Sequence, residues 1–259
     1  MNWDTFIYYA VIAGVCWLAG AGCAFRKRGG WALGWSAVGS LVFLVFLIGF
    51  WMELERPPLR TMGETRLWYS FFLSVVGIGL YAKCRYHWML GFSTLMAWVF
   101  VLVNLLKPEI HSKTLMPALQ SVWFVPHVIV YMFSYALLGA ATLFGGYLWW
   151  RKSPEEPTKE EWTVCDNLVR TGWAFLTMGM TMGALWAKEA WGDYWSWDPK
   201  ETWALATWLS DLLSLHLRPA NRNMHFLFAW LIFSFLLLQM CWWGINFLPS
   251  AQGVSVHTY

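Results

Sequence analysis

Six histidines and one tryptophan-rich stretch are the residues of this 259-residue chain that could do chemistry. Residues 191–203 read WGDYWSWDPKETW, so tryptophans stand there among carboxylates and a lysine. Neutral imidazole is a standard axial ligand of haem iron, and indole rings can cover an apolar macrocycle while their N–H groups bond its carboxylates. Histidines beside this stretch would suit such a ligand. Two plainer interpretations stay open, because tryptophan gathers at membrane interfaces and an isolated histidine is commonly just solvated.

The composition predicts a membrane protein. Hydrophobic residues make up 58% of the chain and charged residues only 13%, whereas a soluble domain carries about a quarter charged residues. A helix needs roughly 20 apolar residues to cross a bilayer core. We therefore expect an all-α, polytopic membrane protein with about eight transmembrane helices in a single domain over residues 1–259. The apolar segments lie near 5–25, 31–52, 67–83, 88–107, 125–150, 168–187, 199–217 and 225–247. The hydrophilic stretch 151–161 is expected to be a solvated loop.

Basic residues in the short loops predict the orientation. Alternate loops form two sets, of which one holds eleven Lys and Arg residues and the other seven. The richer set should face the cytoplasm, which places both termini outside. The richer set comprises loops 26–30, 83–88, 151–170 and 218–224, and the poorer set comprises loops 53–66, 107–126 and 188–200.

This orientation sorts the histidines. His127, at the start of the fifth segment, and His257, in the C-terminal tail, fall outside with the tryptophan-rich loop. His216 falls near the inner end of the seventh segment. Two external histidines that flank an aromatic platform indicate a haem site with two imidazole ligands. The other histidines, in an outer loop or at inner helix ends, are His111, His87 and His225.

Two aspartates have structural interpretations beside functional ones. The run from Asp198 to Glu201 reads as an N-cap, a proline at the first helical position and a glutamate at the third, which is a capped helix start. Asp211 falls near the middle of the seventh segment, where a carboxylate is costly and therefore a functional candidate. Arg218 follows on the same helical face, so a polar contact within the bundle and a role in a haem path both stay open.

The tryptophan-rich loop resembles the WWD signature of the membrane haem-handling proteins of cytochrome c biogenesis. Other stretches resemble one branch, the CcsA (ResC) subunit of the two-component cytochrome c synthase: residues 55–72, His127 in VWFVPHVIVYMFSYA, His216 in LHLR, and GINFL followed by His257. Two departures affect the tail, which is longer than the family pattern and ends GVSVHTY in place of GLHSY. The related CcmC proteins have fewer helices, and their loop does not continue as DPKETW. The matched loop positions are Trp191, Gly192, Trp195, Trp197, Asp198, Pro199, Lys200, Glu201 and Trp203.

The resemblance implies a function and a ligand set. Such proteins carry haem b across the membrane and present it outside for thioether attachment to the CxxCH motif of apocytochrome c. The resemblance implies His127 and His257 as axial ligands at the catalytic site. His216 would bind haem within the membrane together with a histidine of a CcsB (ResB) partner subunit, since no spare histidine here fills that role. The loop residues implied to line the haem are Trp191, Gly192, Trp195, Trp197 and Asp198.

The expected location is the bacterial inner membrane, with the site on its outer face, and a thylakoid membrane is the second choice. Two other functions stay open. A membrane b-type electron carrier would pair histidines well inside the helices, and a haem exporter would lack synthase activity. The net charge of +3 is too small to indicate nucleic-acid binding. The five cysteines form no CxxC or CxxCH sequence, which excludes a thioredoxin-like motif and a c-type cytochrome.

Overall fold

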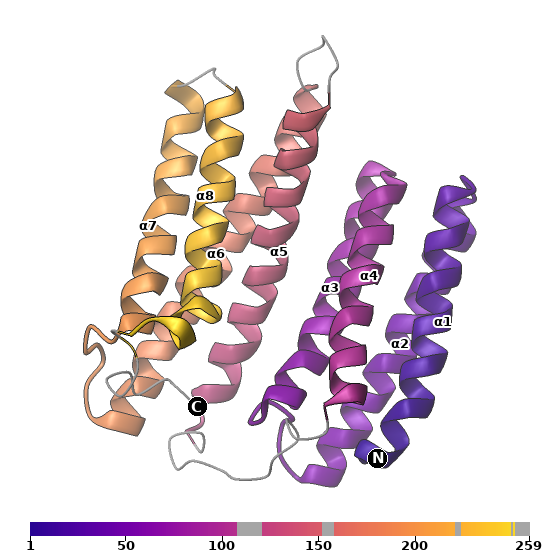
Figure 1. Ribbon diagram of the computed structural model, residues 1–259, viewed down its shortest axis with the longest axis horizontal. Coiled ribbons are helices and arrows are strands. Elements are labelled where there is room, and N and C mark those ends of the chain that lie inside the picture. Colours follow the sequence, from indigo (N-terminus) through magenta and orange to yellow (C-terminus); the bar gives the residue numbers. More distant parts are fainter. Residues whose placement is uncertain (108–120, 152–157, 221–223, 250, 252–259) are drawn as a thin grey trace. The chain divides into compact units, whose positions relative to one another are not determined.

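A computed structural model describes residues 1–107, 121–151, 158–220, 224–249 and 251 of the chain. The described residues form eight α-helices and one short 3-10 helix, which confirms the all-α expectation (Figure 1). Each helix corresponds to one of the eight apolar segments of the sequence, but the eighth, expected to reach residue 247, ends as an α-helix at Trp242 and continues as the short 3-10 helix. The helices are α1 (Trp3–Phe25), α2 (Gly29–Leu54), α3 (Met62–Cys84), α4 (His87–Leu106), α5 (Phe124–Trp150), α6 (Lys159–Trp191), α7 (Pro199–Ala220) and α8 (Met224–Trp242), followed by η3 (Gly244–Phe247).

Two helices begin earlier in the sequence than hydropathy predicts, because capping boxes set their first turns. Helix α3 was expected from residue 67, but Thr61 caps it and Glu64 bonds back to the cap, so it begins at Met62. Helix α6 was expected from residue 168, but Thr158 and Glu161 form the same motif and it begins at Lys159. The expectation of a loop over the whole of residues 151–161 is therefore wrong for its last three residues. Hydropathy misses such turns because a capping box is polar.

The contacts divide the chain into two compact units, Met1–Met116 and Pro117–Tyr259. That the two units serve one function, as a single haem-handling domain, stays a prediction. In the first unit α1 packs on α2 and α4, and α3 packs on α2 and α4. In the second unit α5 packs on α6 and α8, and α7 packs on α6 and α8. Each unit is thus a bundle of four helices in which neighbours along the chain pack side by side.

Aromatic rings and small hydroxyls hold the first unit together. Phe6 lies against Phe43 and Phe46 across the interface of α1 and α2. The indole N–H of Trp17 donates to Ser40 Oγ at 3.1 Å, and Ser40 in turn bonds Ser74 of α3 at 2.9 Å. These bonds satisfy polar groups within the bundle and tie three helices together.

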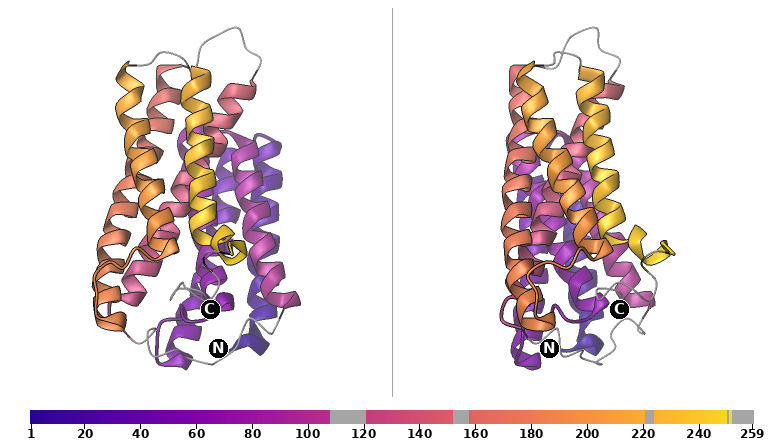
Figure 2. Two further views of the ribbon diagram at one scale, coloured as in Figure 1. Left: turned by 60° about the vertical axis from the view of Figure 1, so that its left-hand side comes forward. Right: turned by 90° about the vertical axis from the view of Figure 1, so that its left-hand side faces the viewer.

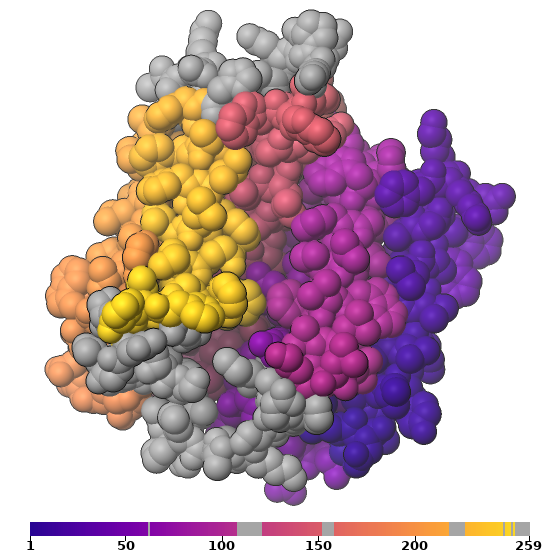
Figure 3. Space-filling view, in the orientation of Figure 1, coloured from indigo at the N-terminus to yellow at the C-terminus, as the bar shows by residue number. Residues whose placement is uncertain are grey.

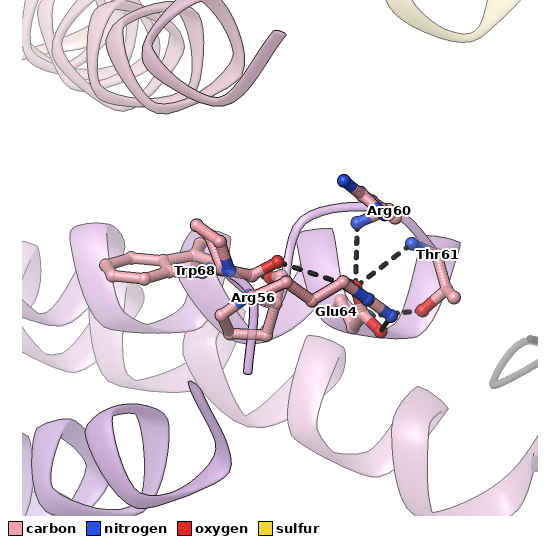
Figure 4. A network of polar contacts seen from close by, with 7 residues as sticks. Arg56, Arg60, Thr61, Glu64 and Trp68 are labelled. Atoms are coloured by element: carbon pink, nitrogen blue, oxygen red, sulfur yellow. Dashed lines mark hydrogen bonds and ion pairs between the residues drawn. The ribbon is translucent and has the colours of Figure 1, made fainter. Parts of the chain in front are cut away.

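A charged network closes the α2–α3 connection (Figure 4). The Glu64 carboxylate is 2% exposed and accepts two hydrogen bonds from the Arg56 guanidinium, at 2.9 and 2.8 Å. It also accepts from the backbone N–H groups of Arg60 and Thr61. The Trp68 indole donates to the Pro58 carbonyl at 3.0 Å. The two hydrogen bonds from Arg56 compensate the cost of burying the Glu64 carboxylate, so that the first turn of α3 can form there.

The second unit is joined by bonds between helices at several depths. Ser134 of α5 donates to the Gly172 carbonyl of α6 at 2.7 Å. The Trp208 indole of α7 donates to Thr177 of α6 at 2.7 Å. Ser210 of α7 and Ser234 of α8 share a hydrogen bond of 2.6 Å. Such hydrogen bonds between helices favour association in a membrane, where apolar burial alone does not.

Five helices are long and apolar enough to cross a membrane: α1, α2, α3 from Gly63, α4 and α5. In α8 the stretch Phe226–Trp242 is apolar but shorter. Helix α6 has 33 residues, which corresponds to about 50 Å, well beyond the roughly 30 Å of a bilayer core. The chain is therefore a polytopic helical membrane protein, and α6 is long enough to carry its last turn clear of the apolar layer.

The start of α5, the end of α6, the start of α7 and the end of α8 lie at one end of the second unit (Figure 2). The connection from α6 to α7 and the short helix η3 lie at this same end. The surface of α8 and η3 is visible in the space-filling view (Figure 3). The loop with the tryptophan-rich sequence therefore lies at the end of the unit where α5 presents its first turn.

Candidate functional site

The imidazole of His127 is held in one orientation by α6. It lies in the first turn of α5, and its Nδ1 is 2.8 Å from the Gly179 carbonyl oxygen. Because a carbonyl only accepts, Nδ1 carries the proton, and Nε2 then has the lone pair that a metal ion needs. The ring also lies edge-on to Tyr131, with centroids 4.7 Å apart. A ring fixed by a backbone acceptor at one nitrogen is the usual arrangement of a metal-ligating histidine.

Aromatic rings connect His127 to the end of α6. Trp186 lies beside His127 with centroids 5.5 Å apart, and it also contacts Phe124 at 5.1 Å. Its other neighbour is Trp191, the last residue of α6, at 4.8 Å. Trp186 is 3% exposed, so it forms the buried link between the histidine and the first tryptophan of the loop. The sequence interpretation missed Trp186, although its place five residues before Trp191 on a helix was a usable signal.

Gly192 ends α6 in the left-handed region, with φ of 95°. This conformation is open to glycine without strain, which gives the glycine of the motif a backbone role. The chain then turns back, and the Lys188 ammonium donates to the Gly192 carbonyl at 2.5 Å. The same ammonium lies 5.4 Å from the centre of the Tyr194 ring. One side chain of α6 therefore holds the beginning of the loop in place.

The two later tryptophans of the loop contact each other. Trp195 and Trp197 lie edge to face with centroids 5.8 Å apart. Trp197 is 67% exposed and has a positive φ of 60°. A bulky residue rarely adopts that backbone conformation, and where it does the surroundings hold it there. Trp197 is therefore an exposed indole on a backbone conformation that few bulky residues adopt.

Asp198 caps α7, as the sequence predicts. Its Oδ1 accepts from the Lys200 N–H at 2.8 Å, and Glu201 Oε2 accepts from the Asp198 N–H at 3.2 Å. Glu201 also accepts from the Ser196 N–H at 2.9 Å, so the loop is tied to the helix from two sides. The carboxylate of Asp198 is buried. Its cap role fixes where the loop ends and α7 begins.

A buried polar cluster next to this cap was not foreseen from the sequence. The Tyr135 hydroxyl lies 3.8 Å from the Cys241 thiol, which in turn lies 3.5 Å from the Lys200 carbonyl. Tyr135 stacks edge-on with Tyr131, the neighbour of His127. The cluster connects the histidine to the beginning of α7 through side chains of α5 and α8. Cys241 is a buried free cysteine that takes part in both of these contacts.

His216 lies far from this cluster. It is 18 residues after Asp198 on the same helix, which corresponds to about 27 Å. Its side chain is exposed, and Nδ1 lies 2.9 Å from the Leu212 carbonyl oxygen. This bond again places the proton on Nδ1 and leaves the lone pair on Nε2. The structure therefore connects His127 to Trp191 through Trp186 and places His216 far along α7 from the loop.

Asp211 lies inside the second unit and is 2% exposed. It lines a small cavity of about 10 Å³ with Thr142 of α5 and Ser234 of α8, room for about one water molecule. Asp211 is thus a buried polar position within the bundle, and both its structural interpretation and a role in a haem path stay predictions. The side chain of Arg218 lies outside the described residues, so the expected contact between the two stays a prediction.

His257 lies outside the described residues, and its pairing with His127 stays a prediction. Within the part of the chain that the structure describes, no three side chains of His, Cys, Asp or Glu gather as a metal site. The residues suited to an axial role are His127 and His216, each with Nδ1 bonded to a carbonyl.

At the opposite end of the unit from His127, Arg151 pairs with Glu161 at 2.6 Å, and this hydrogen bond raises the pKa of Arg151.

Comparison with known proteins agrees with the resemblance of the loop. A model of the cytochrome c assembly protein family matches residues 8–251. A cytochrome c biogenesis protein CcsA from Trachelium caeruleum is 30% identical over 261 residues, covering 83% of this chain and 80% of that protein. The CcsA proteins of Pelargonium hortorum and Solanum tuberosum are 30% and 31% identical, over 86% and 82% of this chain and 86% and 80% of their own lengths. The chain therefore belongs to the cytochrome c assembly protein family, as a cytochrome c biogenesis protein of the CcsA type.

Proposed function

We propose that this protein carries haem b across the membrane and presents it on the outer face for covalent attachment to apocytochrome c. The observation that carries the proposal is the bond between His127 Nδ1 and the Gly179 carbonyl, 2.8 Å long. It places the proton on Nδ1 and leaves the lone pair on Nε2, at the end of the bundle where the tryptophan-rich loop lies. This arrangement suits an axial ligand of haem iron.

The external site would consist of two axial histidines and an aromatic platform. We assign His127 and His257 as the axial ligands, on the strength of the family resemblance and of the ring geometry of His127. The exposed, strained indole of Trp197 suits contact with an apolar macrocycle. The other residues assigned to haem contact are Trp191, Gly192, Trp195 and Asp198, of which Asp198 acts mainly by fixing the loop.

His216 would belong to a second, inner site. It is exposed on α7, about 27 Å along the helix from Asp198, and the bond of its Nδ1 to the Leu212 carbonyl leaves the lone pair on Nε2. An exposed ligand at this position suits a site completed by another subunit, and we propose a CcsB (ResB) protein as that subunit. All eight helices would cross the membrane with both termini outside. The membrane is proposed to be the bacterial inner membrane, with a thylakoid membrane as the alternative.

In the attachment reaction, the main contribution of the protein is to position the haem vinyl groups beside the cysteine thiols. Each cysteine thiol of the CxxCH motif adds across a vinyl group of haem, so a carbon–sulfur bond forms and the thiol proton ends on the other vinyl carbon. No group leaves, and the porphyrin iron is not consumed. The protein contributes by holding the vinyl groups and the thiols together. We therefore propose that it acts as a component of a holocytochrome c synthase, active with its partner.

The test is coexpression with the partner subunit and an apocytochrome, followed by measurement of covalent haem on the cytochrome. We expect covalent haem with the wild type and little with His127→Gly or His257→Gly, with partial recovery on adding imidazole. Wild-type maturation by both variants would exclude the assigned ligands. Haem delivered outside without thioether bonds would instead identify an exporter, and repeated turnover between quinol and an electron acceptor would identify an electron carrier.

A further inference from the structure

Two glycines of α6 face the first turns of α5 at the level of His127. A Cβ atom built on Gly183 would lie 2.7 Å from Cε1 and 2.8 Å from Nδ1 of the His127 ring. A Cβ atom on Gly179 would lie 3.0 Å from the Tyr131 ring. The separation at Gly183 is shorter than real Cβ contacts allow, and the separation at Gly179 is tighter than most of them. The surface of α6 is therefore hollowed where these two rings lie, and the hollow exists because two residues one turn apart have no side chain.

The hollow also sets the protonation of the ring. Only when His127 lies against the backbone of α6 can its Nδ1 reach the Gly179 carbonyl at 2.8 Å. That acceptor makes Nδ1 the protonated nitrogen and leaves the lone pair on Nε2, which lies farther than Nδ1 from the Cβ position of Gly183, at 3.6 Å. A carbonyl bonded to Nδ1–H also makes the ring a stronger donor to a metal ion. One contact thus determines the tautomer, the direction and the basicity of the imidazole.

We propose that Gly183 is a positioning residue for the external haem ligand, which keeps His127 seated against α6 so that Nε2 is the ligand atom. This inference rests on the proposed function, because it concerns how His127 meets haem iron. A methyl group at position 183 would push the ring off α6 and break its bond to the Gly179 carbonyl. The displaced ring would then be a weaker ligand, free to adopt either tautomer.

The chain offers a matched control on the same interface. A Cβ atom on Gly172 would lie 2.8 Å from the Leu138 side chain, nearly the same approach as at Gly183. The Gly172 carbonyl likewise accepts a side-chain hydrogen bond, from Ser134. Gly172→Ala therefore disturbs α5 against α6 to a similar degree, but two to three turns from His127. Gly146 of α5 has nothing within 4 Å of its Cβ position and controls for the glycine-to-alanine change itself.

The experiment measures haem per protein, the absorption spectrum and the midpoint potential of the purified complex with its partner. Gly183→Ala should lower haem affinity by roughly tenfold or more, as loss of a ligand's supporting bond typically does. The remaining haem should show a shifted spectrum and a higher potential, because a less basic imidazole stabilises ferric iron less. Gly172→Ala and Gly146→Ala should keep the wild-type spectrum and potential. Wild-type values in Gly183→Ala, or the same shifts in Gly172→Ala, would overturn the inference.

A double variant separates this inference from the proposed function. Once His127→Gly has removed the ring, Gly183→Ala has nothing to displace, so the double variant should match the single His127→Gly variant. An additional loss of haem in the double variant would contradict the inference. If Gly183→Ala does not accumulate in the membrane, recovery of the double variant supports a clash with His127, and failure of both overturns it. Unchanged haem in His127→Gly would defeat the proposed function itself.

Discussion

Trp186 and Trp191 lie with ring centroids 4.8 Å apart and planes at 60°, and Trp186 also packs beside His127. The last turns of α6 therefore connect the haem-ligand candidate to the beginning of the tryptophan-rich loop. Trp186 is buried in this contact, whereas most of the loop from Gly192 to Trp197 is exposed. A disturbance at Trp186 should reach both the histidine and the loop.

Trp186→Leu is expected to lower haem per folded protein, because it removes the ring between His127 and Trp191. It should also destabilise the protein by about 3 kcal/mol, the usual cost of shrinking a buried aromatic residue. Trp17→Leu is the matched control, since Trp17 is an equally buried indole in the first unit. Thermal unfolding in detergent and haem absorbance of the folded fraction check the result. An equal fall of haem per folded protein in both variants would contradict the specific role of Trp186.

Trp197→Phe is expected to reduce cytochrome maturation without changing membrane insertion. Its free energy of unfolding should stay within about 0.5 kcal/mol of the wild-type value. Trp197 is strongly exposed, so little packing is lost, whereas a haem contact would lose indole area and its N–H group. Trp150→Phe is the control, because Trp150 is an exposed tryptophan at the other end of the second unit. Equal maturation by the Trp197 and Trp150 variants would favour a simple interfacial anchor at position 197.

Much of this fold could be predicted from the sequence, since hydropathy located eight helices and the family motif located the loop. The helix starts at Met62 and Lys159 could not be read from hydropathy, because their first turns hold Glu64 and Glu161. Each carboxylate forms an ion pair with an arginine that precedes the helix in the sequence: Glu64 pairs with Arg56, and Glu161 pairs with Arg151. Hydropathy treats each such residue as a lone charge and therefore starts the helix too late.

The candidate site was predictable only in part for a similar reason. Composition and motif identify His127 and the tryptophans, because residue type alone carries that signal. They do not identify the Gly179 carbonyl, Trp186 or Cys241, whose roles depend on which helix lies opposite. The bond from His127 to Gly179 spans 52 residues of sequence, and no local pattern encodes it. Only the packing of α5 against α6 brings the two together.

Glu64→Gln is expected to destabilise the first unit, because it leaves the partly buried Arg56 guanidinium without its carboxylate partner. Removing one member of a buried pair typically costs about 3–5 kcal/mol. Glu53→Gln is the control, since Glu53 pairs with the N-terminal amine in an exposed position, where the cost should stay below about 1 kcal/mol. Yield after membrane extraction and the thermal midpoint measure the difference. Similar midpoints for the two variants would show that the Arg56–Glu64 pair contributes little to stability.

Two variants of Asp198 can distinguish its role as the N-cap of α7 from a role of its negative charge in the site. Asn caps helices as well as Asp does, so Asp198→Asn should keep α7 and the loop in place, whereas Asp198→Ala should cost about 1 kcal/mol. If the cap is the main role, Asp198→Asn retains haem binding and maturation, and Asp198→Ala loses part of both. Haem spectra and covalent haem on a coexpressed cytochrome make the comparison. Equal losses in the two variants would assign the carboxylate charge itself to the site.

His216→Gly is expected to give stable protein with little haem at either site. The side chain is exposed and bonds only to the Leu212 carbonyl of its own helix among the contacts described, so its removal leaves no cavity. A haem that must pass the inner site before the outer one would then fail to arrive at His127, although His127 is unchanged. Imidazole added during expression should restore part of the haem by filling the vacant axial position.

The order of events distinguishes this role from a structural one. A structural histidine would lower the yield of protein when removed but leave haem per molecule unchanged. His87 supplies a control, because it is a histidine at the start of α4 that packs edge-on against Phe25, within the first unit. His87→Gly should keep normal haem per molecule even where the yield falls. Full haem occupancy in purified His216→Gly would remove His216 from the haem path, while the assignment of His127 at the outer site would stand.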